Sequence, residues 1–282
     1  MMSKIEYEER FAVHQRDVKK YDTTLLREEF LINNIFENDK VKLTYSGYDR
    51  FIVGGAVPKS IDLKLEPIGA LRAEYFCERR EIGIINIGGD AIVTVDGTAY
   101  SIGFKDALFV TRGSKEILLQ SVSKSKPAQL YFNSAPAHRS FKNQVIKRKD
   151  VKVVALGSEK EANKRQILQY IVAATCQTCQ LQMGITELTS GSVWNTMPPH
   201  THTRRMEVYF YTDLPEEHII CHFMGEPQQT RHIWMKNNQA VISPNWSIHA
   251  GAGTTNYSFI WGMAGENLDF MDMDAVQKRD LR

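Results

Sequence analysis

The sequence predicts an all-β protein of sandwich or barrel type, on three observations. Short runs of alternating apolar and polar residues, rich in Val, Ile, Thr and aromatic side chains, recur between turns of Gly, Pro, Asn and Asp. Asp96-Gly97 separates two such runs, which is a strong signal for a β-hairpin. Segments 104–113 and 236–245 each consist of a polar turn, a strand-like run and a second turn. Their likeness favours a duplicated β-barrel.

The expected elements follow the chain in order. One helix is predicted within residues 18–36, because apolar residues recur there at spacings of three and four after a capping residue. In the first half, strands are expected at 41–45, 50–53, 81–87, 91–95, 98–102, 107–110, 116–120 and 129–132. Residues 142–166 are basic and polar without a clear apolar pattern, which predicts a linker. In the second half, strands are expected at 167–173, 179–188, 198–211, 218–224, 230–235, 240–242 and 257–263, before a polar tail, 269–282, in which a short helix fits.

Length and charge exclude several classes of protein. The chain has 282 residues, enough for one large or two modest domains, and a formal net charge of only +2. No global field therefore favours nucleic acid or a membrane as partner. The N-terminus is too charged for a signal peptide, and no apolar run approaches the length that spans a bilayer. We expect a cytoplasmic protein.

Four cysteines in a chain without an export signal predict reduced thiols. Cys176 and Cys179 have the spacing of a zinc knuckle or a redox pair, but the chain has no second pair. An apolar/polar alternation also continues after them. They are interpreted as cysteines that lie by chance in or beside a strand.

The stretch 198–211 predicts a strand that carries most of a metal site. Residues two apart in a strand point to the same face, so His200 and His202 can present both imidazoles to one ion. Glu207 lies five residues beyond His202, which is the wrong face of a regular strand. A bulge or bend within residues 204–206 is therefore expected, and it would let Glu207 join the two histidines.

His249 is the expected fourth ligand, because it follows a hydrophobic run, 239–242, and precedes a Gly-rich turn, 251–253. Three imidazoles and one carboxylate suit Zn²⁺, with Fe²⁺, Mn²⁺, Co²⁺ or Ni²⁺ as alternatives that this donor set does not separate. The competing interpretation is a chance pair of spaced histidines with a hydrogen-bonded structural His249. The order and spacing of all four residues favour the metal site. One ion per chain follows, since the first half has only His14 and His138.

These motifs resemble those of known proteins. His-x-His, then Glu, then Pro-x-Trp-x-x-His is similar to the two metal motifs of the cupin superfamily, although Trp194, Leu214 and Trp246 stand where cupin patterns place glycine. A more specific resemblance, to the 5-keto-4-deoxyuronate isomerase family (4-deoxy-L-threo-5-hexosulose-uronate ketol-isomerases), runs from about Arg27 to Arg282. The blocks that carry it are 76–89, 135–138, 194–198, 202–210, 239–244 and 259–263.

The resemblance implies a bicupin of two β-barrel or jelly-roll halves with a few short helices, divided into residues 1–146 and 147–282. The N-terminal half would be degenerate and without metal, and the C-terminal half would hold one zinc ion on the four ligands named above. The implied enzyme is an intramolecular oxidoreductase, a zinc-dependent aldose-ketose isomerase of pectin or related uronate breakdown. It would convert the small uronate 5-dehydro-4-deoxy-D-glucuronate to 3-deoxy-D-glycero-2,5-hexodiulosonate.

Substrate-binding and proton-transfer groups are less sharply defined. A guanidinium can hold a carboxylate with two hydrogen bonds, so Arg204, Arg205 and Arg231 are candidates for the substrate's carboxylate, with surface or interface ion pairs as the alternative. The sequence does not identify the catalytic base. Candidates for the proton shuttle, each of which also suits core packing or ordinary hydrogen bonding, are Tyr209, Tyr211, Tyr257, His232 and Glu266.

Two other functions remain compatible with these motifs. A metal-dependent cupin dioxygenase would use iron on the same ligands and would consume O₂. A non-catalytic sugar-binding cupin would bind uronates without turnover, its metal serving only to hold the barrel together.

The resemblance predicts a closed homo-hexamer, in which the helix near residues 25–36 could pack against a neighbouring chain. Light scattering should then give a mass of about 190 kDa, six times the 32.2 kDa of one chain. A mass near that of one chain at micromolar concentration would contradict the prediction.

Overall fold

Two units, each with one large and one small β-sheet, make up the chain. The computed structural model describes residues 4–266 and 269–282. Unit 1 comprises the residues up to Phe11 together with Asn34–Val151 and Tyr170–Gln182, and unit 2 comprises Ala12–Asn33, Lys152–Gln169 and Met183–Arg282. Two segments, 12–33 and 170–182, thus belong to the unit that the other half of the sequence mainly forms. The division at residues 146 and 147 stays a prediction.

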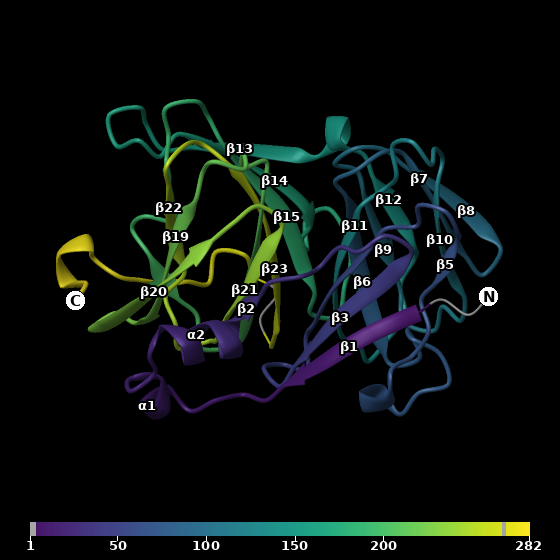
Figure 1. The fold of residues 1–282 in the computed structure, drawn as a ribbon, viewed down its shortest axis with the longest axis horizontal. Coiled ribbons are helices and arrows are strands. Elements are labelled where there is room, and N and C mark those ends of the chain that lie inside the picture. Colours follow the sequence, from purple (N-terminus) through teal and green to yellow (C-terminus); the bar gives the residue numbers. More distant parts are fainter. Residues whose placement is uncertain (1–3, 267–268) are drawn as a thin grey trace. The chain divides into compact units, whose positions relative to one another are not determined.

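Unit 1 holds a seven-stranded sheet in the order β1-β3-β4-β11-β6-β9-β12 and a four-stranded sheet in the order β5-β10-β7-β8 (Figure 1). Buried side chains from both sheets, among them Leu43, Val93 and Leu119, form a common core. The elements are β1 (Lys4–Arg10), β3 (Lys40–Ser46), β4 (Ile52–Ala56), β5 (Leu63–Lys64), η1 (Gly69–Leu71), β6 (Arg80–Asn86), β7 (Ala91–Val95), β8 (Thr98–Ile102), β9 (Ala107–Val110), β10 (Ile117–Ser121), β11 (Leu130–Pro136), β12 (Gln144–Ile146) and η2 (Arg148–Asp150).

Unit 2 holds a seven-stranded sheet in the order β13-β14-β15-β23-β18-β21-β2, a four-stranded sheet in the order β16-β22-β19-β20, and the pair β17-β24. Its helices are α1 (Gln15–Val18), α2 (Thr23–Phe30) and the 3₁₀ turn η3 (Lys278–Asp280). Its strands are β2 (Leu31–Ile32), β13 (Lys152–Leu156), β14 (Arg165–Ile171), β15 (Gln182–Leu188), β16 (Trp194–Asn195), β17 (His200–Thr201), β18 (Arg205–Thr212), β19 (Ile220–Glu226), β20 (Gln229–Met235), β21 (Gln239–Ser243), β22 (Ala250–Gly253), β23 (Ser258–Gly265) and β24 (Asp274–Ala275).

The strand orders repeat between the units. In unit 1, β6 lies between β11 and β9, and in unit 2, β18 lies between β23 and β21. Segments 104–113 and 236–245, which look alike in sequence, form β9 and β21, and these strands occupy equivalent places. The all-β prediction is confirmed, and the repeated order supports the expectation of a bicupin.

Local signals placed several elements correctly. The Asp96-Gly97 turn joins β7 and β8, and both residues have the positive φ angles that a tight hairpin of this kind requires. The predicted helix is α2, which begins after Asp22, whose side chain accepts a hydrogen bond from the Leu25 backbone N–H.

No helix among the described residues is long and apolar enough to cross a membrane.

Two glycine-containing segments lie inside strands, and the second of them was expected to form a turn. Gly54-Gly55 belongs to β4, and residues 251–253 belong to β22. A Cβ on Gly54 would lie 2.2 Å from the ring of Phe132, and a Cβ on Gly251 would lie 2.9 Å from the hydroxyl of Tyr211. These glycines permit close packing within the units. A glycine needed for close packing looks the same in the sequence as a glycine needed for a turn.

The expected linker at 142–166 is wrong, because it contains β12 and β13. The N-terminal strand β1 was also not expected. It is an edge strand that pairs in parallel with β3, and its Glu6 forms an ion pair with Lys40 at 2.7 Å. Charged edge strands lack the apolar alternation that identifies a half-buried strand.

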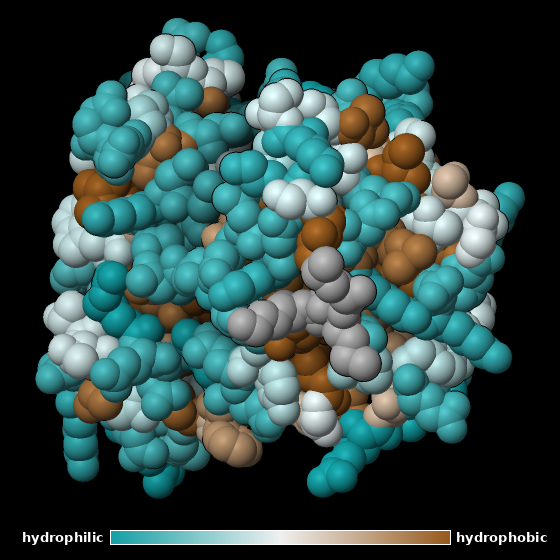
Figure 2. Space-filling view, turned by 45° about the vertical axis from the view of Figure 1, so that its right-hand side comes forward, coloured by the Kyte–Doolittle hydropathy of each residue, from teal (hydrophilic) through white to brown (hydrophobic). Residues whose placement is uncertain are grey.

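The surface drawn in Figure 2 is mainly hydrophilic, with hydrophobic residues scattered in small groups over the face shown. Most of the large apolar side chains of both units are buried. This distribution is typical of sheets that bury their apolar faces against each other.

Candidate metal centre

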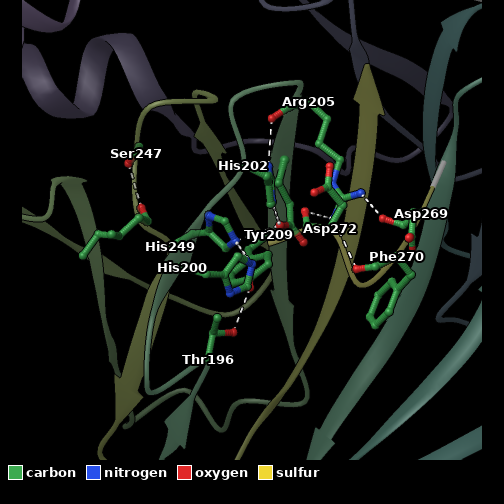
Figure 3. Close-up of polar contacts among 12 residues, drawn as sticks. Thr196, His200, His202, Arg205, Tyr209, Ser247, His249, Asp269, Phe270 and Asp272 are labelled. Atoms are coloured by element: carbon green, nitrogen blue, oxygen red, sulfur yellow. Dashed lines mark hydrogen bonds and ion pairs between the residues drawn. The ribbon is translucent and has the colours of Figure 1, made fainter. Parts of the chain in front are cut away.

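Three imidazoles and one carboxylate converge in unit 2. The ligand atoms of His200, His202, Glu207 and His249 all lie within 4.8 Å of one another. The Nε2 atom of His249 is 2.9 Å from Nε2 of His200 and 2.9 Å from Oε2 of Glu207. The Nε2 atom of His202 is 3.1 Å from the same carboxylate oxygen. The structure therefore brings together all four residues that the sequence nominated, and Figure 3 shows the three imidazoles gathered at one place.

Two strands and the connection between them, rather than the one predicted strand, carry the first three of these side chains, and His202 lies in the connection. His200 lies in β17, which pairs with β24 near the C-terminus, and Glu207 lies in β18. The chain turns between them at Thr203-Arg204. The prediction of a continuous strand is wrong because the expected bend is a full turn that begins one residue earlier. His249, the fourth residue, immediately precedes β22.

A backbone contact orients the ring of His202. Its Nδ1 atom is 2.9 Å from the carbonyl oxygen of Arg205. Because a carbonyl only accepts hydrogen bonds, Nδ1 carries a proton, and Nε2 is the ring nitrogen that faces Glu207. Metal-binding histidines are held by contacts of this kind through their second ring nitrogen.

Burial and mutual proximity shift the pKa values of two of the donors, His200 and Glu207, toward the forms that bind a cation. Burial lowers the pKa of His200, and neighbouring His249 lowers it further, so the His200 imidazole is neutral at physiological pH. Burial raises the pKa of Glu207, but His249 and His202 outweigh this effect and hold that pKa below its usual range. Neutral imidazoles and an ionised carboxylate are the forms that ligate metals.

The donor set fits a divalent cation better than it fits hydrogen bonding alone. The facing Nε2 atoms of His200 and His249 can share at most one proton, and both residues offer a ligand atom within 4.8 Å of a carboxylate oxygen of Glu207. Three nitrogen donors and one oxygen donor match the common ligand sets of Zn²⁺ and related ions. The four residues could therefore hold one such ion.

The cluster faces a cavity of about 240 Å³, which residues of unit 2 line. His200 and Glu207 contribute to its wall, and much of the remaining wall is apolar, including Trp261, Met263 and Phe270. An apolar cavity with a few convergent polar groups is the usual form of a small-molecule site.

Tyr209 is the member of the proposed proton-shuttle set that lines this cavity. Its hydroxyl is 2.8 Å from the hydroxyl of Thr196, which also lines the cavity, and its ring centroid is 5.3 Å from that of His249. Burial raises the pKa of Tyr209 well above its usual value, and Glu207 raises it further. The phenol therefore stays protonated at neutral pH.

The other shuttle candidates have different surroundings. Tyr211 lies 2.8 Å from Nδ1 of buried His222, and Tyr257 accepts a hydrogen bond from Asn195 at 2.6 Å. Both tyrosines are fully buried. His232 and Glu266 are exposed side chains outside the cavity wall.

The three arginines nominated for the substrate's carboxylate are engaged elsewhere. Exposed Arg204 forms an ion pair with Asp272. Buried Arg205 donates to the backbone oxygens of three residues of the C-terminal segment (Figure 3), and Arg231 donates to the backbone of Lys19. The sequence did not indicate Arg165, which does line the cavity, because it lies within the predicted linker. An alternation of apolar and polar residues around Arg165 would have been the only local sign that it lies in a strand beside the site.

Unit 1 has a carboxylate in the equivalent place but no comparable cluster. In the register that aligns β6 and β9 with β18 and β21, Glu81 corresponds to Glu207. In the small sheets, the core residue Leu119 corresponds to His249. The Glu81 carboxylate accepts hydrogen bonds from the backbone N–H groups of residues 179–181 at 2.8 to 3.1 Å. Within the described ranges, the unit 2 cluster is the only group of three or more metal-type side chains.

Comparison with known proteins gives consistent matches over almost the whole chain. A family model described as the KduI/IolB family matches residues 39–278. A protein of Formosa agariphila named 4-deoxy-L-threo-5-hexosulose-uronate ketol-isomerase is 57% identical over 276 residues, which cover 98% of this chain and 99% of that protein. A protein of the same name from Lachnoclostridium phytofermentans is 54% identical over 273 residues, covering 97% and 99%.

A solved structure is also similar. An IolB-like protein from Salmonella typhimurium LT2 has a TM-score of 0.68 at 15% identity, and the match covers 80% of this chain and 87% of that one. At this identity the likeness shows a shared fold.

Replacing His249 by alanine should remove most of the bound metal, because a buried ligand is lost from a four-donor site. His138→Ala is the control, since this exposed histidine belongs to unit 1 and should leave one metal per chain. Elemental analysis of both purified variants checks the prediction. A full equivalent of metal in His249→Ala would remove His249 from the ligand set.

Glu81→Leu should destabilise the protein without loss of metal. The change leaves three backbone N–H groups without their acceptor, which costs about 2–4 kcal/mol of unfolding free energy. Calorimetric melting and metal analysis of the variant test this. An unchanged melting temperature would show that the Glu81 contacts contribute little.

Proposed function

The chain belongs to the KduI/IolB family, and from that premise we propose that it is a zinc-dependent aldose-ketose isomerase. Its substrate in this proposal is 5-dehydro-4-deoxy-D-glucuronate and its product is 3-deoxy-D-glycero-2,5-hexodiulosonate. The observation that carries the proposal is the convergence of His200, His202, Glu207 and His249 beside a cavity. The names of the relatives that are 57% and 54% identical support the choice of reaction.

Zinc is the proposed ion because three imidazoles and one carboxylate suit it and the reaction needs no redox change. When bound, the ion would act as a Lewis acid that stabilises negative charge developing on neighbouring oxygens. The three histidines and Glu207 would hold it, and the backbone oxygen of Arg205 fixes the ring of His202.

The isomerisation moves one proton from the hydroxyl-bearing carbon to the adjacent aldehyde carbon and a second proton from the hydroxyl oxygen to the former aldehyde oxygen, which shifts the carbonyl by one position. The chain's own residues around the cavity suit this chemistry. The hydroxyls of Thr196 and Tyr209 share a hydrogen bond at the wall, and the protonated phenol can donate to a substrate oxygen. The apolar side chains of Trp261 and Phe270 limit water around the reacting atoms.

The same proposal includes the cellular setting. We place the enzyme in the cytoplasm, as a homo-hexamer, in pectin or related uronate breakdown. All four cysteines are free thiols, which fits a reducing compartment.

The purified protein should convert the proposed substrate with no added nucleotide and no oxygen consumption. Chelation should abolish the activity and Zn²⁺ should restore it, because the other groups at the cavity cannot stabilise the developing charge to the same degree. Product formation and dissolved oxygen are measured in the same reaction.

Three outcomes would redirect the assignment. Unchanged isomerisation by fully metal-free protein would refute the metal-dependent mechanism. Oxygen uptake that depends on substrate would indicate a dioxygenase. Binding of the uronate without turnover would indicate a sugar-binding cupin.

A further inference from the structure

Arg165 brings a cationic side chain to the wall of the cavity. It lies in β14, and its half-buried guanidinium lines the same space as Glu207 and His200. One of its five N–H groups, on Nη1, donates to the backbone oxygen of Asn163 at 2.8 Å. This contact leaves the guanidinium with hydrogen-bonding capacity to spare.

No carboxylate of the described chain neutralises Arg165. Burial lowers the pKa of Arg165, and the two buried phenols near it, Tyr209 and Tyr257, carry no charge at neutral pH. Charged groups withdrawn from water are normally paired, because desolvation of an unpaired charge is costly. The partner of this guanidinium is therefore expected to come from outside the chain, as an anion in the cavity.

The neighbouring arginines have fewer donors left to bind an anion. Arg204 already has Asp272 as its partner, and Arg205 donates to three backbone oxygens. Both contacts hold the C-terminal segment. Arg165 is the cavity-lining arginine whose donors are least used.

We propose that Arg165 binds the carboxylate of the substrate and makes the cavity selective for uronates over neutral sugars. This inference rests on the proposed function and names the residue that recognises its substrate class. A guanidinium is suited to the role because its planar fork matches the two oxygens of a carboxylate.

Tyr209 connects this anion site with the imidazole cluster. It lines the cavity together with Arg165, and its ring packs edge-on against the ring of His249. A sugar acid whose carboxylate meets Arg165 would extend along the Thr196–Tyr209 hydroxyl pair toward the histidines. The carboxylate and the reacting carbons would then be recognised by different groups.

The test compares the uronate with its neutral primary amide on wild-type protein and on Arg165→Met. For the acid, the variant should raise KM by about 30-fold with a smaller change in kcat, because hydrogen bonds to a charged group are lost. For the amide, KM should change less than about threefold, since the carboxylate is already absent. Arg165→Lys should recover part of the affinity for the acid, because it restores the charge without the fork.

Two controls separate recognition from folding. Arg279→Met removes an exposed arginine outside the cavity wall and should behave as wild type. Metal content and melting temperature of Arg165→Met should match those of wild type. Equal losses on acid and amide, or an unchanged KM for the acid, would overturn the proposal and leave Arg165 a structural role.

The anion site can also be tested if the proposed reaction proves wrong. If the wild type turns over neither compound, titration calorimetry with the same acid and amide supplies the readout. A preference for the acid that Arg165→Met abolishes would support the anion site even though the reaction assignment had failed. Absence of any such preference in the wild type would overturn the anion site as well.

Discussion

The arrangement of the cavity depends on one buried carboxylate held among three imidazoles. Burial alone would drive Glu207 toward its neutral form, and proximity to His202 and His249 reverses that tendency. Three lone-pair donors and one anion in so small a space repel one another unless a cation or protons lie between them. The turn at Thr203-Arg204, the contact of His202 with the Arg205 carbonyl and the position of His249 before β22 all serve to keep these donors together.

The two units show how the same strand framework can satisfy a buried carboxylate in different ways. Glu207 in unit 2 faces imidazoles, whereas Glu81, its counterpart in unit 1, accepts hydrogen bonds from three successive backbone N–H groups. The position that corresponds to His249 is occupied by Leu119, which packs into the core of unit 1. A single substitution in unit 1 would therefore not recreate a metal site, because both the ligands and the space around the carboxylate have changed.

Local sequence patterns predicted much of the fold and nominated the residues of the cluster, because alternation with a period of two and the Asp96-Gly97 turn are short-range signals. The features that the sequence did not reveal depend on contacts between distant segments. β1 is recognisable as a strand only beside β3, and residues 12–33 and 170–182 group with units that local composition does not indicate. Arg165 lies in the segment that was predicted to be a linker, and its place at the cavity follows from the fold of β14.

The central claim is that one cation binds at the four converging donors of unit 2. A crystal structure of the purified protein, with anomalous diffraction recorded at the zinc edge, tests it directly. We predict one peak per chain at about 2.0–2.2 Å from Nε2 of all three histidines and from a carboxylate oxygen of Glu207. A peak at Cys176 and Cys179, a second site in unit 1, or no density among the three histidines in metal-loaded protein would contradict the account.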